Sequence, residues 1–245
     1  MKIAVISLGC AKNRIDSELF LGLASKYGLD INANYNLIEL VDQSDLESAD
    51  IIVINTCGFI ESAKKESLDT IFEMLDYQKQ GKKIAVMGCL VERYLDELKK
   101  EIPEVDYFLP IRSYPELFKF FKKLTNSDKQ YSFYDADRFL STPSKCAYIR
   151  IGEGCDNCCT YCAIPLIRGK YHSRNMDDIL TESVNGSGYN EKYGLLGSNK
   201  ATEETVKLFP RAGQELVEEI QVQMLKRTGK HVEVMVHLEF RVTLL

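Results

Sequence analysis

The first 125 residues alternate between short apolar runs and amphipathic stretches. β-branched apolar runs lie at residues 3–8, 51–54 and 84–87, and such runs are typical of strands buried on both faces of a parallel sheet. Apolar residues at helical spacing follow each run, within residues 16–27, 62–80 and 91–100. This alternation predicts an α/β domain with a parallel sheet over residues 1–125, which ends with a helix at 115–124.

The pattern becomes less regular after this domain. Residues 126–145 are rich in turn formers and lack a clear period, so we predict a linker there. The run CAYIRI then predicts a strand that opens a second domain at 146–182. Residues 183–245 look atypical: a loop or disordered stretch, a segment that is helical in its second half, and a terminal strand within KHVEVMVHLEFRV.

Three cysteines follow the three apolar runs. Cys10, Cys57 and Cys89 each lie beside a glycine at a predicted strand end. Ligands of open α/β sheets bind beyond the carboxyl ends of the strands, so these cysteines should be delivered to one rim. Each of them could instead be a small buried hydrophobic residue, but three at equivalent positions favour a shared site.

A second group of cysteines lies in GEGCDNCCTYCAIP. Cys155, Cys159 and Cys162 have the spacing C-x-x-x-C-x-x-C, and three thiolates on a four-iron cluster leave one iron open to bind a small molecule. Zinc held by two C-x-x-C pairs, with Cys158 as the fourth ligand, is the alternative. The two pairs are adjacent in the sequence, whereas such pairs in zinc sites are usually well separated. We therefore interpret Cys158 as a residue that binds no metal and Cys146 as a structural residue.

Composition narrows the class of protein. The chain has 245 residues, of which 45% are hydrophobic, and no stretch approaches the roughly 20 apolar residues that span a bilayer. The opening MKIAVISLGC does not resemble an export signal, so we expect a cytoplasmic protein in which cysteines serve metal binding or catalysis rather than disulfides. A formal net charge of -5 gives no long-range attraction to a phosphate backbone.

Four blocks of the sequence resemble, in order, the conserved blocks of the radical S-adenosylmethionine methylthiotransferase family. They are LGCAKNRIDSE, NTCGFIESAKKESL, MGCLVERY and EGCDNCCTYCAIPLIRGKYHSR, and the resemblance covers about residues 1–182. It implies an N-terminal methylthiotransferase α/β domain followed by the start of a radical barrel. It also implies two [4Fe-4S] clusters, one on Cys10, Cys57 and Cys89 for sulfur insertion, and one on the second triplet that cleaves S-adenosylmethionine.

The resemblance also bears on substrate and partners. Lys12 and Asn13, after the first cysteine, are similar to the protein-modifying branch, which implies methylthiolation of an aspartate β-carbon on small-subunit ribosomal protein 12. A transfer RNA substrate is the alternative within the family, and an iron–sulfur module without catalysis is the alternative outside it. The resemblance further implies an electron donor such as flavodoxin or ferredoxin as a partner, and it implies no association with a membrane.

Several residues near the second triplet have open interpretations. Tyr161 has two interpretations: packing beside the cofactor, as the resemblance implies, or a plain packing aromatic. Arg168, Lys170 and Arg174 could meet a carboxylate, although a solvated face is favoured. After Glu182 only 63 residues remain (245 minus 182), so we expect a partial barrel that is too short to close and an enzyme whose activity is impaired by truncation.

Overall fold

The computed structural model describes the chain as two compact units. It covers residues 1–31, 43–112, 114–129, 131, 138–139, 141, 146–157, 159–175, 178, 205–209 and 234–236. The first unit comprises Met1–Ser141 together with Cys158–Arg168, and the second comprises Thr142–Asn157 together with Gly169–Leu245. The first unit is therefore assembled from two separate segments of the chain.

A five-stranded parallel sheet forms the centre of the first unit. Its strands are β1 (Lys2–Ser7), β2 (Asp30–Ile31), β3 (Ile51–Thr56), β4 (Lys83–Gly88) and β5 (Tyr107–Leu109), in the order β2-β1-β3-β4-β5. The three strands predicted from apolar runs are β1, β3 and β4, and they are neighbours in the sheet. β3 is buried along its whole length, as its uninterrupted apolar run predicts for a central strand.

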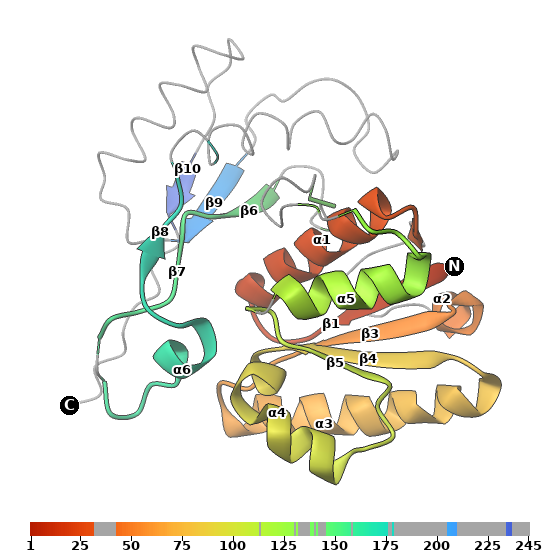
Figure 1. Cartoon of the computed structure of the whole chain (residues 1–245). Helices are drawn as coiled ribbons and strands as arrows, with labels where there is room; N and C mark the ends of the chain where they lie inside the picture. The colour runs from red at the N-terminus through yellow and green to blue at the C-terminus, as the bar shows by residue number, and fades with distance from the viewer. Residues whose placement is uncertain are drawn as a thin grey trace. The chain divides into compact units, whose positions relative to one another are not determined.

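Helices cover both faces of this sheet. They are α1 (Ala11–Lys26), α2 (Gln43–Ser48), α3 (Glu61–Leu75), α4 (Cys89–Glu101) and α5 (Tyr114–Thr125), with a 3₁₀ turn, η1 (Asp76–Gln80), after α3. Figure 1 shows α1 and α5 on one face and α3 and α4 on the other. The α/β class with a parallel sheet is thus confirmed.

Two helices begin earlier than their apolar periodicity predicts. α1 starts at Ala11 rather than at residue 16, and α4 starts at Cys89 rather than at residue 91. Neither helix has a side-chain cap, and Cys10 and Gly88 occupy the N-cap positions. Without a Ser, Thr, Asp or Asn before the first turn, the usual start signal is missing, so the cysteines' place at the helix ends could not be read from the pattern.

Different side chains fill the two layers of the core. On the face covered by α1 and α5, the rings of Tyr27 and Phe121 stack with centroids 4.9 Å apart, and Phe20 lies 5.2 Å from Phe121. On the other face, branched residues of β3 and β4 such as Ile54 pack with Ile71 of α3. Close packing in both layers keeps the sheet rigid next to the carboxyl ends of β1, β3 and β4.

The second unit contains an open parallel sheet and a short hairpin. The sheet has the order β10-β9-β6, from β6 (Cys146–Arg150), β9 (Thr205–Phe209) and β10 (Val234–Val236). β7 (Gly152–Glu153) and β8 (His172–Ser173) form the antiparallel hairpin. The described strands do not close into a barrel, as we expected.

Parts of the sequence predictions remain predictions. β10 lies within the predicted terminal strand, whereas β9 was not predicted, and the helical segment before β10 lies outside the described residues. The described part of 126–145 contains no helix or strand, and the domain boundaries at 125, 145 and 182 stay predictions. Among the described helices, none has the length and apolar character needed to cross a bilayer.

Candidate metal centre

The first three cysteines lie where three neighbouring strands end. Cys57 and Cys89 directly follow β3 and β4, and Cys10 lies three residues after β1. Because parallel strands end at the same edge of a sheet, Cys10, Cys57 and Cys89 share one rim of the first unit. Cys10 is exposed, whereas Cys57 and Cys89 are buried.

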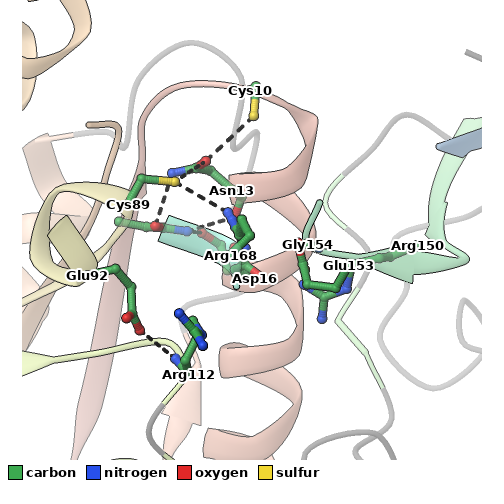
Figure 2. Close-up of polar contacts among 12 residues, drawn as sticks. Cys10, Asn13, Asp16, Cys89, Glu92, Arg112, Arg150, Glu153, Gly154 and Arg168 are labelled. Atoms are coloured by element: carbon green, nitrogen blue, oxygen red, sulfur yellow. Dashed lines mark hydrogen bonds and ion pairs between the residues drawn. The ribbon is translucent and has the colours of Figure 1, made fainter. Parts of the chain in front are cut away.

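Asn13, in the first turn of α1, connects two of these thiols. The Sγ atoms of Cys10 and Cys89 each donate to Asn13 Oδ1 at 3.6 Å (Figure 2). The Nδ2 of Asn13 donates to the Thr56 carbonyl at 2.8 Å, and Asn55 Nδ2 donates to the Asn13 carbonyl at 2.7 Å. Asn13 is fully buried, so this network fixes the start of α1 against the end of β3.

Glycines allow the three cysteine loops to approach one another. A Cβ on Gly9 would lie 2.7 Å from the Cβ of Cys57, and one on Gly58 would lie 2.8 Å from the Cα of Leu90. Gly88 has φ +102, and a Cβ there would lie 2.3 Å from the Thr56 carbonyl oxygen. Side chains at these positions would separate the loops that carry the thiols.

Burial and local charge act on the thiols in opposite directions. Burial raises the pKa of Cys57 and of Cys89, and the nearby guanidinium of Arg168 offsets only part of this rise in both. Cys89 also lies at the N-terminus of α4, where the helix dipole favours a negative charge. A cluster ligand has to be a thiolate, and Arg168 and the helix end favour that form.

Arg168 belongs to this site, although we expected it on a solvated face. It ends α6 (Ile164–Arg168), which packs against α4 through Ala163, Ile167 and Cys89. Its side chain is 6% exposed; Nη1 pairs with Asp16 Oδ2 at 2.6 Å, and Nη2 donates to Cys89 Sγ at 3.4 Å. The solvated-face interpretation is wrong for Arg168 because α6 folds back onto the first unit.

In the second unit, Cys155 lies on a tightly held loop between β7 and β8. Its backbone N donates to the Gly169 carbonyl at 3.0 Å, and Asn157 Nδ2 donates to its Sγ at 3.4 Å. Gly154 has φ +78, and a Cβ there would lie 2.1 Å from the Lys170 carbonyl oxygen. Only glycine fits this close approach, so the loop conformation depends on Gly154.

Cys159 and Cys162 belong to the first unit, on the segment that leads into α6. The Cys162 N donates to the Cys159 carbonyl at 3.1 Å, which closes a turn. Tyr161 between them is 78% exposed, so it is not a packing aromatic in this structure. Lys170 and His172 are exposed and Arg174 is half-buried, while Cys158 lies outside the described residues.

The donor set suits a cluster better than a single ion. Among the described residues, no three His, Cys, Asp or Glu side chains are arranged to hold one metal ion. Thiols that bind different irons of a four-iron cluster lie farther apart than the ligands of one ion, and thiolates are the usual cluster ligands. Three cysteines around one rim fit that requirement.

Sequence reasoning missed the polar residues that support the rim. In the sequence, Asn13 stands out only through the resemblance to one branch of the family, and Asp16 only as the predicted start of a helix. Their spacing of three residues would have placed both on one side of α1, but only if the helix had been predicted to begin at Ala11. The burial of Arg168 could not be predicted because it depends on the packing of α6.

Comparison with known proteins gives a match to one family model and to several relatives that share one name. Residues 2–110 match the model described as "Uncharacterized protein family UPF0004", which spans β1 to β5. The chain is 44% identical to a ribosomal protein uS12 methylthiotransferase RimO of Acetivibrio thermocellus, over 82% of this chain and 46% of that protein. It is 46% identical to the protein of the same name from Clostridioides difficile, over 75% of this chain and 41% of that protein.

A solved structure supports the fold. The cobalamin-dependent S-adenosylmethionine radical enzyme OxsB matches with a TM-score of 0.52 and 12% identity, over 92% of this chain and 37% of that chain. At this identity the match concerns the fold alone. The chain spans less than half the length of the curated relatives that it matches.

Proposed function

We propose that this chain contributes to methylthiolation of a ribosomal protein. The proposal rests on its similarity, over most of its residues, to the RimO methylthiotransferase family. The substrate would be an aspartate β-carbon of small-subunit ribosomal protein uS12, the protein named in its relatives. The reaction would take place in the cytoplasm, with electrons from a donor such as flavodoxin or ferredoxin.

The meeting of three cysteines at one sheet edge carries the proposal. Cys10, Cys57 and Cys89 would hold an auxiliary [4Fe-4S] cluster, and Asn13 already connects two of their thiols. Glycines at 9, 58 and 88 leave room for the three loops to come close together. An edge built in this way supports delivery of sulfur from a cluster rather than a purely structural role for the cysteines.

The second triplet would supply the radical chemistry. Cys155, Cys159 and Cys162 would hold a [4Fe-4S] cluster whose open iron binds S-adenosylmethionine, and this group supplies the radical that breaks an unactivated C–H bond. The exposed ring of Tyr161 is available to contact the cofactor. Asn157 would donate to the Cys155 sulfur and orient it.

A second candidate is an iron–sulfur module that holds clusters but performs no catalysis. The observation that favours it is the second unit, whose described strands form an open sheet. A cofactor in an open sheet would be poorly shielded from water. The two candidates share the same cluster ligands and differ only in turnover.

Iron content after anaerobic reconstitution tests the ligands. We expect about eight irons per chain, because each [4Fe-4S] cluster contributes four. Replacing Cys10, Cys57 and Cys89 by Ala should remove about half, and replacing Cys155, Cys159 and Cys162 should remove the other half. Cys146→Ala is the matched control and should leave the iron content unchanged. Zinc in place of iron would exclude both candidates.

Turnover distinguishes the candidates. Formation of 5′-deoxyadenosine from S-adenosylmethionine under reducing conditions, lost in the second triple variant, would support the enzyme. Full iron loading without any 5′-deoxyadenosine would support the module. Mass spectrometry of ribosomal protein uS12 and of bulk transfer RNA after incubation then identifies the substrate, and a methylthio group on transfer RNA alone would exclude the protein substrate.

A further inference from the structure

We propose that Arg168 is a positioning residue for the cluster on Cys10, Cys57 and Cys89. Its guanidinium, held by Asp16, donates a hydrogen bond to the sulfur of Cys89 and thereby raises the reduction potential of that cluster. The inference rests on the proposed function in one respect, namely that the first triplet binds a cluster. It adds a residue from the segment after the second triplet to the site formed by the first.

The geometry of the guanidinium carries the inference. Arg168 reaches two elements at once, since Nη1 contacts Asp16 of α1 at 2.6 Å and Nη2 contacts Cys89, the first residue of α4, at 3.4 Å (Figure 2). Arginine presents its donors in a planar fork, so fixing one nitrogen on the carboxylate aims the other at the sulfur. Asp16 is buried as well, so the contact is shielded from solvent.

Packing keeps the fork in place. α6 lies against α4 through Ala163 and Ile167, and Cys89 is part of the same buried cluster. The backbone N atoms of Leu166 and Ile167 bond to the Ala163 carbonyl, which makes a rigid turn before Arg168. The guanidinium is therefore positioned by a packed helix, and it does not belong to an exposed side chain with many accessible conformations.

The effect on a cluster follows from charge. Once Cys89 is a thiolate ligand, the Arg168 N–H donates to a negatively charged sulfur, a bond stronger than one between neutral groups. Hydrogen bonds to ligand sulfurs and nearby positive charge both favour the reduced, more negative cluster and so raise its potential. Asp16 opposes this through its own negative charge, which makes the two residues separable by experiment.

The test uses the full chain with Cys155, Cys159 and Cys162 replaced by Ala, so that only the first cluster forms. After anaerobic reconstitution, the midpoint potential is measured by an electron paramagnetic resonance titration. We expect Arg168→Met to shift the midpoint to lower potential. Asp16→Asn removes the negative charge but keeps a side-chain oxygen facing Arg168 Nη1, so we expect it to shift the midpoint to higher potential. Arg168→Lys should lie between Arg168→Met and the parent. Lys170→Met, which removes an exposed cation, is the control and should not shift it.

Opposite shifts distinguish this role from a merely structural one. Loosened packing would change the midpoint of Arg168→Met and Asp16→Asn in the same direction, and this result would overturn the inference, as would an unchanged midpoint in iron-loaded Arg168→Met. Should Arg168→Met lose its iron, Asp16→Asn decides, because an unshifted midpoint there also overturns the inference. A parent that binds no iron overturns the proposed function itself.

Discussion

At the scale of single residues, Glu18 is a buried carboxyl that connects two distant segments. It lies on α1 and accepts hydrogen bonds from the Ser141 N at 2.9 Å and the Ser141 Oγ at 2.7 Å, while Arg138 Nε lies 3.4 Å from its other oxygen. Burial raises the pKa of Glu18 above its ordinary value of 4.5, against the lowering effect of Arg138, Ser141 and Arg14. Arg138 and Ser141 are thus held against α1.

This raised pKa predicts a stability that falls as pH rises. Above about pH 4.5 the unfolded carboxyl loses its proton while the folded one retains it, so the unfolded state is favoured progressively up to the folded pKa. Glu18→Gln cannot titrate. We therefore expect the free energy of unfolding of the wild type, relative to Glu18→Gln, to decrease between pH 5 and pH 7 in urea denaturation.

The control for this prediction is Glu61→Gln on α3. The hydrogen bond from Lys64 lowers the pKa of Glu61, so the free energy of unfolding of the wild type relative to this variant should not decrease over the same pH range. A difference between wild type and Glu18→Gln that instead grows with pH would mean that the ion pair with Arg138 dominates and that the carboxyl pKa is lowered.

Residue-scale prediction from sequence succeeded where a pattern repeats. Three cysteines at three strand ends indicated a common rim, and the structure places them there. Asn13, Asp16 and Arg168 carry no such repeat. Their roles depend on which side of α1 faces the rim and on the packing of α6, and both depend on contacts between segments far apart in the sequence.

At the scale of elements, the join between β4 and α4 depends on Gly88. Ala at this position would combine a positive φ with a Cβ only 2.3 Å from the Thr56 carbonyl oxygen. We expect Gly88→Ala to lower the free energy of unfolding by about 3 kcal/mol or more, because strain from the backbone and from overpacking add. Urea denaturation measures the loss, and iron content should fall because the loop carries Cys89.

Gly81 is the matched control for this prediction. It also has a positive φ, of +81, but a Cβ there meets nothing within 4 Å. Gly81→Ala should therefore cost only the backbone strain, about 1 kcal/mol, and leave iron content unchanged. Equal losses for the two variants would show that the close approach of β4 to Thr56 contributes nothing to stability.

Element prediction worked best for long apolar runs. β1, β3 and β4 can be predicted from the sequence because a strand covered on both faces must be apolar throughout. β2, with two residues, and β5, with three, are too short to show a period. β9 has Lys207 at its centre, which interrupts the apolar run, and its pairing with β6 is a tertiary contact.

At the scale of the whole molecule, charge discriminates between the possible substrates. The chain has a net charge of -5, so its long-range field attracts basic proteins and repels nucleic acid. The proposed substrate is ribosomal protein uS12, and its binding can be measured by fluorescence anisotropy. If it binds through this attraction, its affinity should weaken several-fold between 50 and 300 mM salt because screening reduces the attraction. Transfer RNA should bind weakly at every salt concentration, and tight, salt-sensitive binding of it would contradict the expectation.

The discontinuous first unit has a consequence for folding during synthesis. Residues 1–141 leave the ribosome first, and the sheet with its five strands lies wholly within them. Nevertheless, Cys89 gains its contacts with Ala163, Ile167 and Arg168 only when a further 27 residues have emerged (168 minus 141). A nascent chain halted before Arg168 therefore leaves Asp16 and Cys89 without their guanidinium partner, so the N-terminal unit completes its packing late, after Cys162 has been translated.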